Sequence, residues 1–217
     1  MRGLLIKDFR LMKNQGRSLI IIVAVAVAVN LWIDNYAFII AYLGFIGVSL
    51  AMSTITYDEY DNGNAFLFSL PITPKEYAAE KYIFSLLFVG GAWLIGTVGG
   101  AAMQLAKEAT TMGDIFAVDL MLLLALILIL AIMLPFQLKF GAEKGRIIRI
   151  VVLMLGVGII AAGVQLAEMW NLSLSDKTVS LPVLNTETVG AIGAVLAAAV
   201  LYISWKISVS IMKKKEF

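Results

Sequence analysis

Long apolar runs separated by short polar stretches dominate this chain. Six runs stand out, and most reach the roughly 20 residues that a helix needs to cross about 30 Å of hydrocarbon. The pattern predicts an all-α membrane protein, a bundle of six transmembrane helices at 18–33, 36–57, 82–104, 115–138, 147–169 and 188–206. At about 1.5 Å per residue the first run spans only about 24 Å, so we expect its helix to begin earlier, near Asn14.

Composition supports a membrane location. Hydrophobic residues make up 61% of the 217 residues and charged residues only 15%, whereas soluble domains are nearer half apolar and a quarter charged. The length suits a single transmembrane domain over 1–217. The chain has no cysteine or histidine, which excludes disulfides, metal sites built on those residues and histidine acid–base catalysis.

The distribution of lysine and arginine predicts the orientation. With the N-terminus inside, fifteen of the 17 basic residues fall on the cytoplasmic side, and only Lys107 and Lys177 lie outside. This bias is the positive-inside pattern, and it places both termini in the cytoplasm. A cleaved signal peptide is disfavoured because the small residues Ala24 and Ala26 lie inside the apolar run and not after it.

Residues 1–17 have the spacing of an amphipathic helix. Leu5, Phe9 and Met12 fall on one face, and Lys7 and Arg10 fall on another. We expect an interfacial helix in the headgroup plane, with basic residues toward anionic lipid. The alternative is an unstructured basic tail that only orients the first span.

The predicted spans carry no clear buried charge, since Asp119 is placed near the outer end of the fourth span. Ion-coupled transporters and intramembrane hydrolases need such groups, so both classes are disfavoured. The chain also lacks a phosphate-binding Gly-x-x-x-x-Gly-Lys-Ser/Thr motif. If the protein moves a substrate, the energy has to come from another subunit.

The connection at 58–81 is the most unusual stretch, because it is acidic where cytoplasmic loops are usually basic, and it is also rich in aromatic residues. A short helix is predicted to end near Leu70 and Pro71, because proline cannot continue it. Thr73 is then a predicted N-cap, with Pro74 at the first helical position and Glu76 three residues on.

Two interpretations of this short helix stay open on physical grounds alone. Its aromatic and acidic residues suit docking into a groove of a soluble partner, where aromatic anchors give affinity and acids give orientation. Alternatively, its apolar side chains rest on the membrane surface.

The same stretch resembles a known family. An acidic segment with glycine, then Ser-Leu-Pro-Ile-Thr, then a polar helix ending in Lys-Tyr, resembles permease subunits of ABC-2 type transporters. Together with the six spans and the amphipathic start, it looks most similar to small permeases of bacterial amphipathic-peptide exporters, such as the phenol-soluble modulin exporter. The matching residues are Glu59, Gly63, Ser69, Leu70, Pro71, Ile72, Thr73, Lys75, Glu76, Lys81 and Tyr82.

The resemblance implies a non-catalytic permease in the bacterial plasma membrane. Two permease chains, expected to be a homodimer, would form a pathway for an amphipathic peptide or other hydrophobic substrate. Two ATPase subunits would hold the ATP and Mg, and this chain would need no cofactor and bind no nucleic acid. The helix within 58–81 would be the coupling helix, and the residues expected to contact the ATPase are Asp58, Glu59, Tyr60, Asp61, Gly63, Phe66, Leu67, Leu70 and Pro71. A non-transporting membrane scaffold or immunity-type protein is the alternative function.

Overall fold

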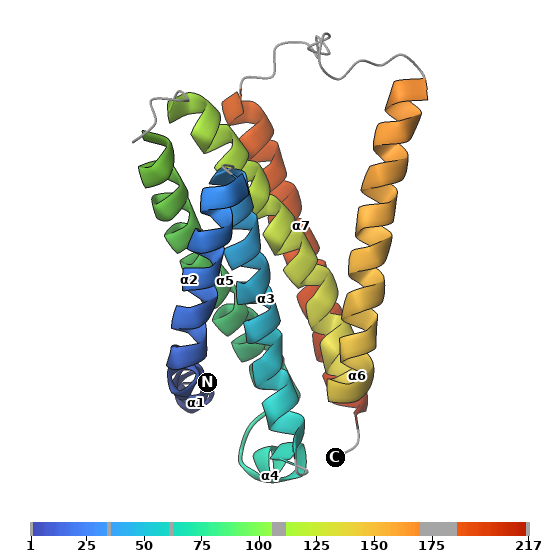
Figure 1. The fold of residues 1–217 in the computed structure, drawn as a ribbon. Helices are drawn as coiled ribbons and strands as arrows, with labels where there is room; N and C mark the ends of the chain where they lie inside the picture. The colour runs from blue at the N-terminus through green and yellow to red at the C-terminus, as the bar shows by residue number, and fades with distance from the viewer. Residues whose placement is uncertain (1, 34–35, 61–62, 106–111, 170–185, 216–217) are drawn as a thin grey trace.

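The computed structural model describes residues 2–33, 36–60, 63–105, 112–169 and 186–215. The described residues form seven helices and no strand, as the apolar pattern predicts (Figure 1). The helices are α1 (Arg2–Asn14), α2 (Gly16–Ile33), α3 (Tyr36–Glu59), α4 (Gly63–Ser69), α5 (Pro74–Leu105), α6 (Met112–Met169) and α7 (Thr186–Lys214).

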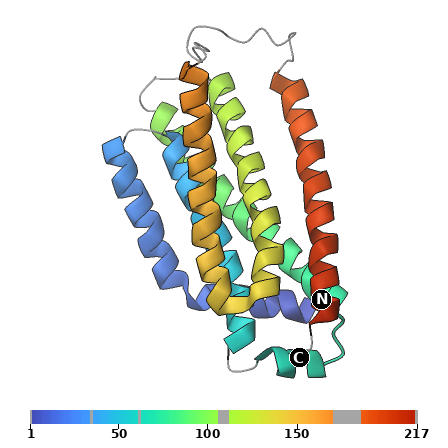
Figure 2. The ribbon, with the colours of Figure 1, turned by 90° about the vertical axis from the view of Figure 1, so that its right-hand side faces the viewer.

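Helix α1 lies across one end of the bundle, and the chain bends by 62° between α1 and α2 (Figure 2). This arrangement agrees with the predicted interfacial helix, and α2 begins at Gly16, ahead of residue 18 and two residues from the expected start near Asn14. Both termini and α4 lie at this same end, which we call the α4 end (Figure 1). Residues 34–35, between the first two predicted spans, lie outside the described residues.

Helix α6 turns back on itself at Gly141, where φ is 71° and ψ is −166°. This backbone region is essentially restricted to glycine, so one residue suffices to separate two helical arms. The predicted spans leave a connection between 138 and 147, and as a loop this is wrong, because helix continues on both sides of Gly141. The two arms, 112–140 and 142–169, correspond to the predicted fourth and fifth spans.

Four helical segments within the described residues are long and apolar enough to cross a bilayer, and α1 with α2 would make a fifth if that bent pair counts as one span. The four are Ala37–Glu59, Pro74–Ala102, Asp119–Gly141 and Gly190–Lys214. The sixth span and the side of the membrane on which the termini lie stay predictions.

Helix α3 is the centre of the bundle and packs against α2, α5 and α6. Its approach to α5 depends on small residues. A Cβ added to Gly47 would lie 2.9 Å from Cβ of Ala92, and one added to Gly96 would lie 2.9 Å from Cα of Ile40. The small residues of α3 and α5 therefore let the two helix backbones approach closely.

Candidate functional site

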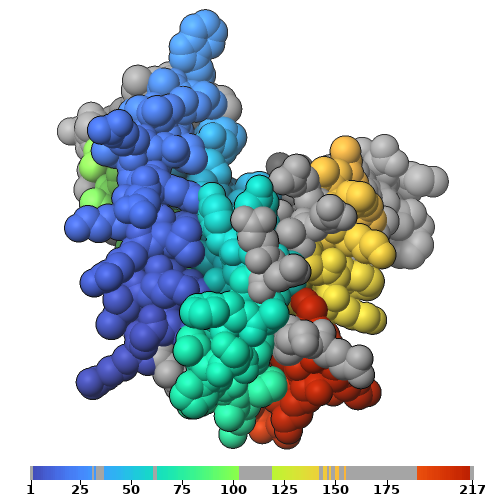
Figure 3. Space-filling model, turned by 90° about the horizontal axis from the view of Figure 1, so that it is seen from below, coloured from blue at the N-terminus to red at the C-terminus, as the bar shows by residue number. Residues whose placement is uncertain are grey.

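Helix α4 protrudes at the α4 end of the bundle, between α1 and α7 in the view of Figure 3. Phe66 is 72% exposed, and Tyr60, just before the helix, is exposed to the same extent. Leu70, at the far end of α4, is also exposed. Large exposed aromatic side chains grouped on a protruding element are the kind of anchors that protein interfaces use.

The opposite face of α4 holds it on the bundle. Leu67 is buried in the main apolar core, and Phe68 packs against that core. The Phe68 ring lies 5.5 Å from the Tyr77 ring of α5. The short helix is thus fixed by its inner face while its outer aromatic residues stay free of the bundle.

The start of α5 is fixed by a reciprocal cap, as predicted. The Glu76 N–H donates to Thr73 Oγ1 at 3.2 Å, and the Thr73 N–H donates to Glu76 Oε2 at 3.0 Å. This capping box satisfies backbone donors at the N-terminus of α5. It sets the point at which the chain leaves α4 and enters the third predicted span.

A cluster of charged side chains lies buried where α1, α3 and α5 meet. We call it the buried ion-pair cluster, and it comprises Lys7, Asp8, Asp58, Glu80 and Lys81. Lys81 is only 1% exposed, and its Nζ lies 2.5 Å from Asp8 Oδ2 and 2.7 Å from Asp58 Oδ2. One ammonium group of α5 therefore joins a carboxylate of α1 to a carboxylate of α3.

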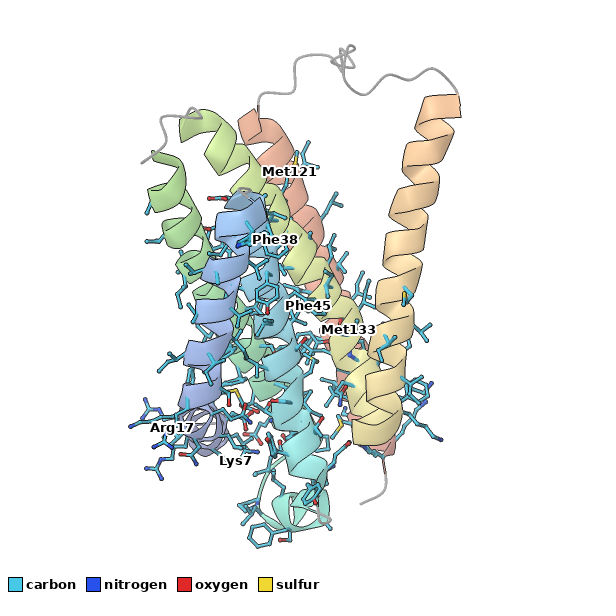
Figure 4. All side chains as sticks on the ribbon, in the orientation of Figure 1. Lys7, Arg17, Phe38, Phe45, Met121 and Met133 are labelled. Carbon is cyan, nitrogen blue, oxygen red and sulfur yellow. The ribbon has the colours of Figure 1, made fainter. Side chains whose placement is uncertain are left out.

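Further groups complete the cluster. Lys7, on α1 beside the lower part of α3 (Figure 4), donates to Asp58 Oδ1. The Tyr77 hydroxyl donates to Asp58 Oδ2 at 3.1 Å, and Lys81 also donates to Thr54 Oγ1 at 3.3 Å. Buried charges are tolerated only when they are paired and hydrogen-bonded in this way.

Glu80 differs from the other members of the cluster. It is fully buried and its Oε2 lies 3.8 Å from Lys81 Nζ, yet neither carboxylate oxygen accepts a hydrogen bond from the described residues. The cluster thus holds three carboxyl groups against two amino groups, so its formal charges do not balance.

Buried charges do lie on the apolar helices, because Asp58 falls within Ala37–Glu59 and Lys81 within Pro74–Ala102, both longer than the predicted spans. Asp119 is also largely buried, and the Trp93 indole N–H donates to the Asp119 carbonyl oxygen at 3.1 Å. The signal that identifies Lys81 is its position two turns inside α5, which begins at Pro74 as the predicted cap indicates. Lys81 therefore lies on this helix just before the predicted span at 82–104.

The residue after Asp58 makes a second link, to the opposite side of the bundle. Glu59 Oε1 accepts from Lys215 Nζ at 2.8 Å, so the end of α3 is tied to the end of α7. A Cβ on Gly141 would lie 2.6 Å from Glu59 Oε2, so the turn of α6 also packs on this carboxylate. Adjacent residues at the α3–α4 junction thus connect to α1 and α5 on one side and to α6 and α7 on the other.

The residues predicted to contact an ATPase fall into distinct environments. Tyr60, Phe66, Leu70 and Pro71 are exposed, whereas Asp58 and Leu67 are directed into the bundle. Glu59 and Gly63 are half-buried, and Asp61 lies outside the described residues. We call these exposed aromatic and apolar members, Tyr60, Phe66, Leu70 and Pro71, the α4 surface.

Nothing in this arrangement resembles a catalytic centre. Among the side chains that the structure describes, no group of three or more acidic residues could hold a metal ion. At the α4 end, Asp8, Asp58 and Glu59 form ion pairs with Lys7, Lys81 and Lys215.

Comparisons with known proteins agree with a membrane component of a transporter. Neither the curated proteins nor the solved structures give a significant match. The profile of the ABC-2 family transporter proteins matches residues 3–213, nearly the whole chain. The chain therefore belongs to the ABC-2 transporter family, as a non-catalytic, multi-pass membrane permease.

Proposed function

We propose that this permease exports an amphipathic peptide or a similar hydrophobic substrate, driven by ATPase subunits that bind the α4 surface. Family membership implies an ATPase partner. The observation that carries the proposed docking site is the exposure of Tyr60, Phe66 and Leu70 on an element whose inner face is firmly packed.

The links behind α4 suit the transmission of movement. A push on α4 reaches Asp58 and Glu59 directly, since they end α3 next to it. Asp58 leads to α1 and α5 through Lys81, and Glu59 leads to α7 through Lys215. ATP-driven movement of the partner would then bias the whole bundle between two conformations and not only one helix.

The substrate class is proposed from the chemistry of the spans and from the likeness to amphipathic-peptide exporters. Several polar side chains within the bundle bond to one another, as Tyr82 does with Ser204 at 2.5 Å and with Ser208 at 2.9 Å. Such spans offer few contacts for small ions or sugars, which need dense polar groups. Two copies of this permease, each with an ATPase subunit, would enclose the pathway.

The test is purification of the tagged permease in mild detergent, followed by mass spectrometry of the proteins that accompany it. We expect a stoichiometric ATPase subunit with the natural chain and with Phe66→Leu, which keeps an apolar side chain. Phe66→Asp should abolish the association, because a carboxylate would enter an apolar contact. Equal recovery with Phe66→Asp would refute the docking site, and purification of the natural chain alone would favour the scaffold or immunity-type function.

Transport is tested separately in vesicles that contain the permease and the recovered ATPase. ATP should drive accumulation of a fluorescent amphipathic helical peptide. A peptide of the same composition with its apolar face scrambled serves as the control. Equal transport of both peptides, or transport of neither peptide, would refute the proposed substrate class.

A further inference from the structure

An apolar groove lies between α2, α3 and α5, away from the α4 surface. Its volume is about 360 Å³, and every side chain that lines it is apolar. The ring of Phe9 on α1 contributes to one end, and the remaining lining comes from the three spans, including Leu19, Val23, Leu43, Leu87 and Ile95.

The groove is open because the neighbouring helices leave space there. Helix α2 packs mainly along α3, and α5 presents glycine to the gap. Gly91 lines the groove, and a Cβ added to it would meet no atom within 4 Å. The space lies at the depth of apolar span residues, so its occupant has to be compatible with hydrocarbon.

Three basic residues flank the α1–α2 bend, close in sequence to residues that line the groove. Arg10 follows Phe9 directly, and Arg17 lies two residues before Leu19, at the lower end of α2 (Figure 4). Lys13 lies between them in sequence, and all three basic side chains are exposed. The described part of α1 has a single carboxylate, Asp8, which is buried and paired with Lys81.

We propose that this groove binds one acyl chain of an anionic phospholipid, whose phosphate is held by Arg10, Lys13 and Arg17. An acyl chain has no polar atom to satisfy inside the groove. A peptide segment would bring amide groups that the apolar lining cannot hydrogen-bond, at a cost of several kcal/mol per group in hydrocarbon. The three exposed basic residues beside the α1–α2 bend would supply the charge that selects an anionic headgroup over a zwitterionic one.

The bound lipid would also position α1. The Phe9 ring lies 5.1 Å from the Phe84 ring of α5, edge to face at 74°. Phe9 is next to Asp8, so a lipid that seats Phe9 favours the geometry in which Asp8 reaches Lys81. The inference does not depend on the ATPase or on the transported substrate.

Native mass spectrometry of the purified permease, titrated with phosphatidylglycerol or phosphatidylcholine, tests the site. The matched pair of variants is Gly91→Leu, which fills the groove, and Gly90→Leu. Gly90 is the preceding residue of α5, where a Cβ also meets no atom within 4 Å but which does not line the groove. We expect Gly90→Leu to retain one tightly bound phosphatidylglycerol, as the natural chain does, and Gly91→Leu to lose it.

The headgroup is tested by the double variant Lys13→Gln with Arg17→Gln. It should lower the preference for phosphatidylglycerol over phosphatidylcholine by about tenfold or more, since each basic residue near the surface contributes roughly a factor of five. Equal phosphatidylglycerol retention by Gly91→Leu and Gly90→Leu would overturn the proposal. So would a Gly91→Leu variant that loses a second copy of the chain but keeps its lipid. If Gly91→Leu does not fold, Leu19→Trp fills the same groove from α2.

Discussion

Lys81 is a buried lysine whose ammonium group lies between two carboxylates. Its ammonium group lies within 2.7 Å of Asp58 and 2.5 Å of Asp8, away from water. Removing one partner of a buried ion pair leaves the other charges without compensation, and the usual cost is about 3–5 kcal/mol. We expect Lys81→Gln to lower the apparent melting temperature in detergent sharply, in contrast to Lys75→Gln, which alters an exposed lysine of the same helix.

Glu80→Gln is the informative companion, because Glu80 is the carboxyl group in excess within the cluster. Its substitution should leave the melting temperature unchanged or raise it, since it relieves repulsion among three buried carboxyl groups. Similar losses in Lys81→Gln and Glu80→Gln would mean that packing at this point, and not charge pairing, determines stability.

Gly141 gives a second prediction at this scale. Its φ of 71° with ψ of −166° is a region that other residues enter at a cost of about 1–3 kcal/mol. An alanine Cβ would also lie 2.6 Å from Glu59 Oε2. We expect Gly141→Ala to destabilise the permease in a thermal unfolding assay, whereas Gly90→Ala, in open helical space, should not. Adding Glu59→Ala should recover only part of the loss, because the backbone strain remains.

Thr73 and Lys81 differ in how far their contacts could be predicted from the sequence. Thr73 and Glu76 interact within one turn, so their spacing alone predicts the capping box that the structure contains. The partners of Lys81 lie 73 and 23 residues away in sequence, at Asp8 and Asp58. Pairing over such separations depends on how three helices pack. It therefore cannot be predicted from the spacing of neighbouring residues.

Among the elements, the α3–α4 junction connects the most parts of the bundle. Glu59 ends α3 and accepts a hydrogen bond from Lys215, beyond α7, at 2.8 Å. We expect Glu59→Lys to weaken recovery of the ATPase, because two like charges would then repel at this junction. The exchange Glu59→Lys with Lys215→Glu should restore recovery if the link is internal.

Recovery that stays low in the exchanged variant would show that Glu59 contacts the ATPase itself. A restored melting temperature without restored ATPase binding would lead to the same conclusion. The measurement is therefore made on both quantities, with Lys215→Glu alone as the matched control. This separates a role in transmission from a role in docking.

The positions of the helices are predictable where neighbouring residues in the sequence determine them, and less so where they do not. Apolar length placed the cores of the helices, and Pro71 together with Thr73 placed the gap between α4 and α5. The turn of α6 is shorter than the connection that the predicted spans leave between 138 and 147. A single residue, Gly141, makes that turn. Apart from the glycine itself, nothing in the amino-acid composition around it indicates its backbone conformation.

For the whole molecule, the gathering of both termini and α4 at one end agrees with an even number of crossings (Figure 1). The side of the membrane on which that end lies follows from the basic residues, of which fifteen of 17 are expected inside. The chain contains no cysteine, so single cysteine variants label at one known position.

Four such variants distinguish six spans from five. Ser69→Cys on α4 and Lys213→Cys near the end of α7 should react with a membrane-impermeant maleimide only after the cells are permeabilised. Thr110→Cys and Asp176→Cys, in the connections before and after α6, should react in intact cells. Both arms of α6 separate Thr110 from Asp176, so labelling of these two from opposite sides would mean that one arm does not cross. Labelling of Ser69→Cys and Lys213→Cys from outside would reverse the orientation and place the α4 surface beyond the reach of any cytoplasmic ATPase.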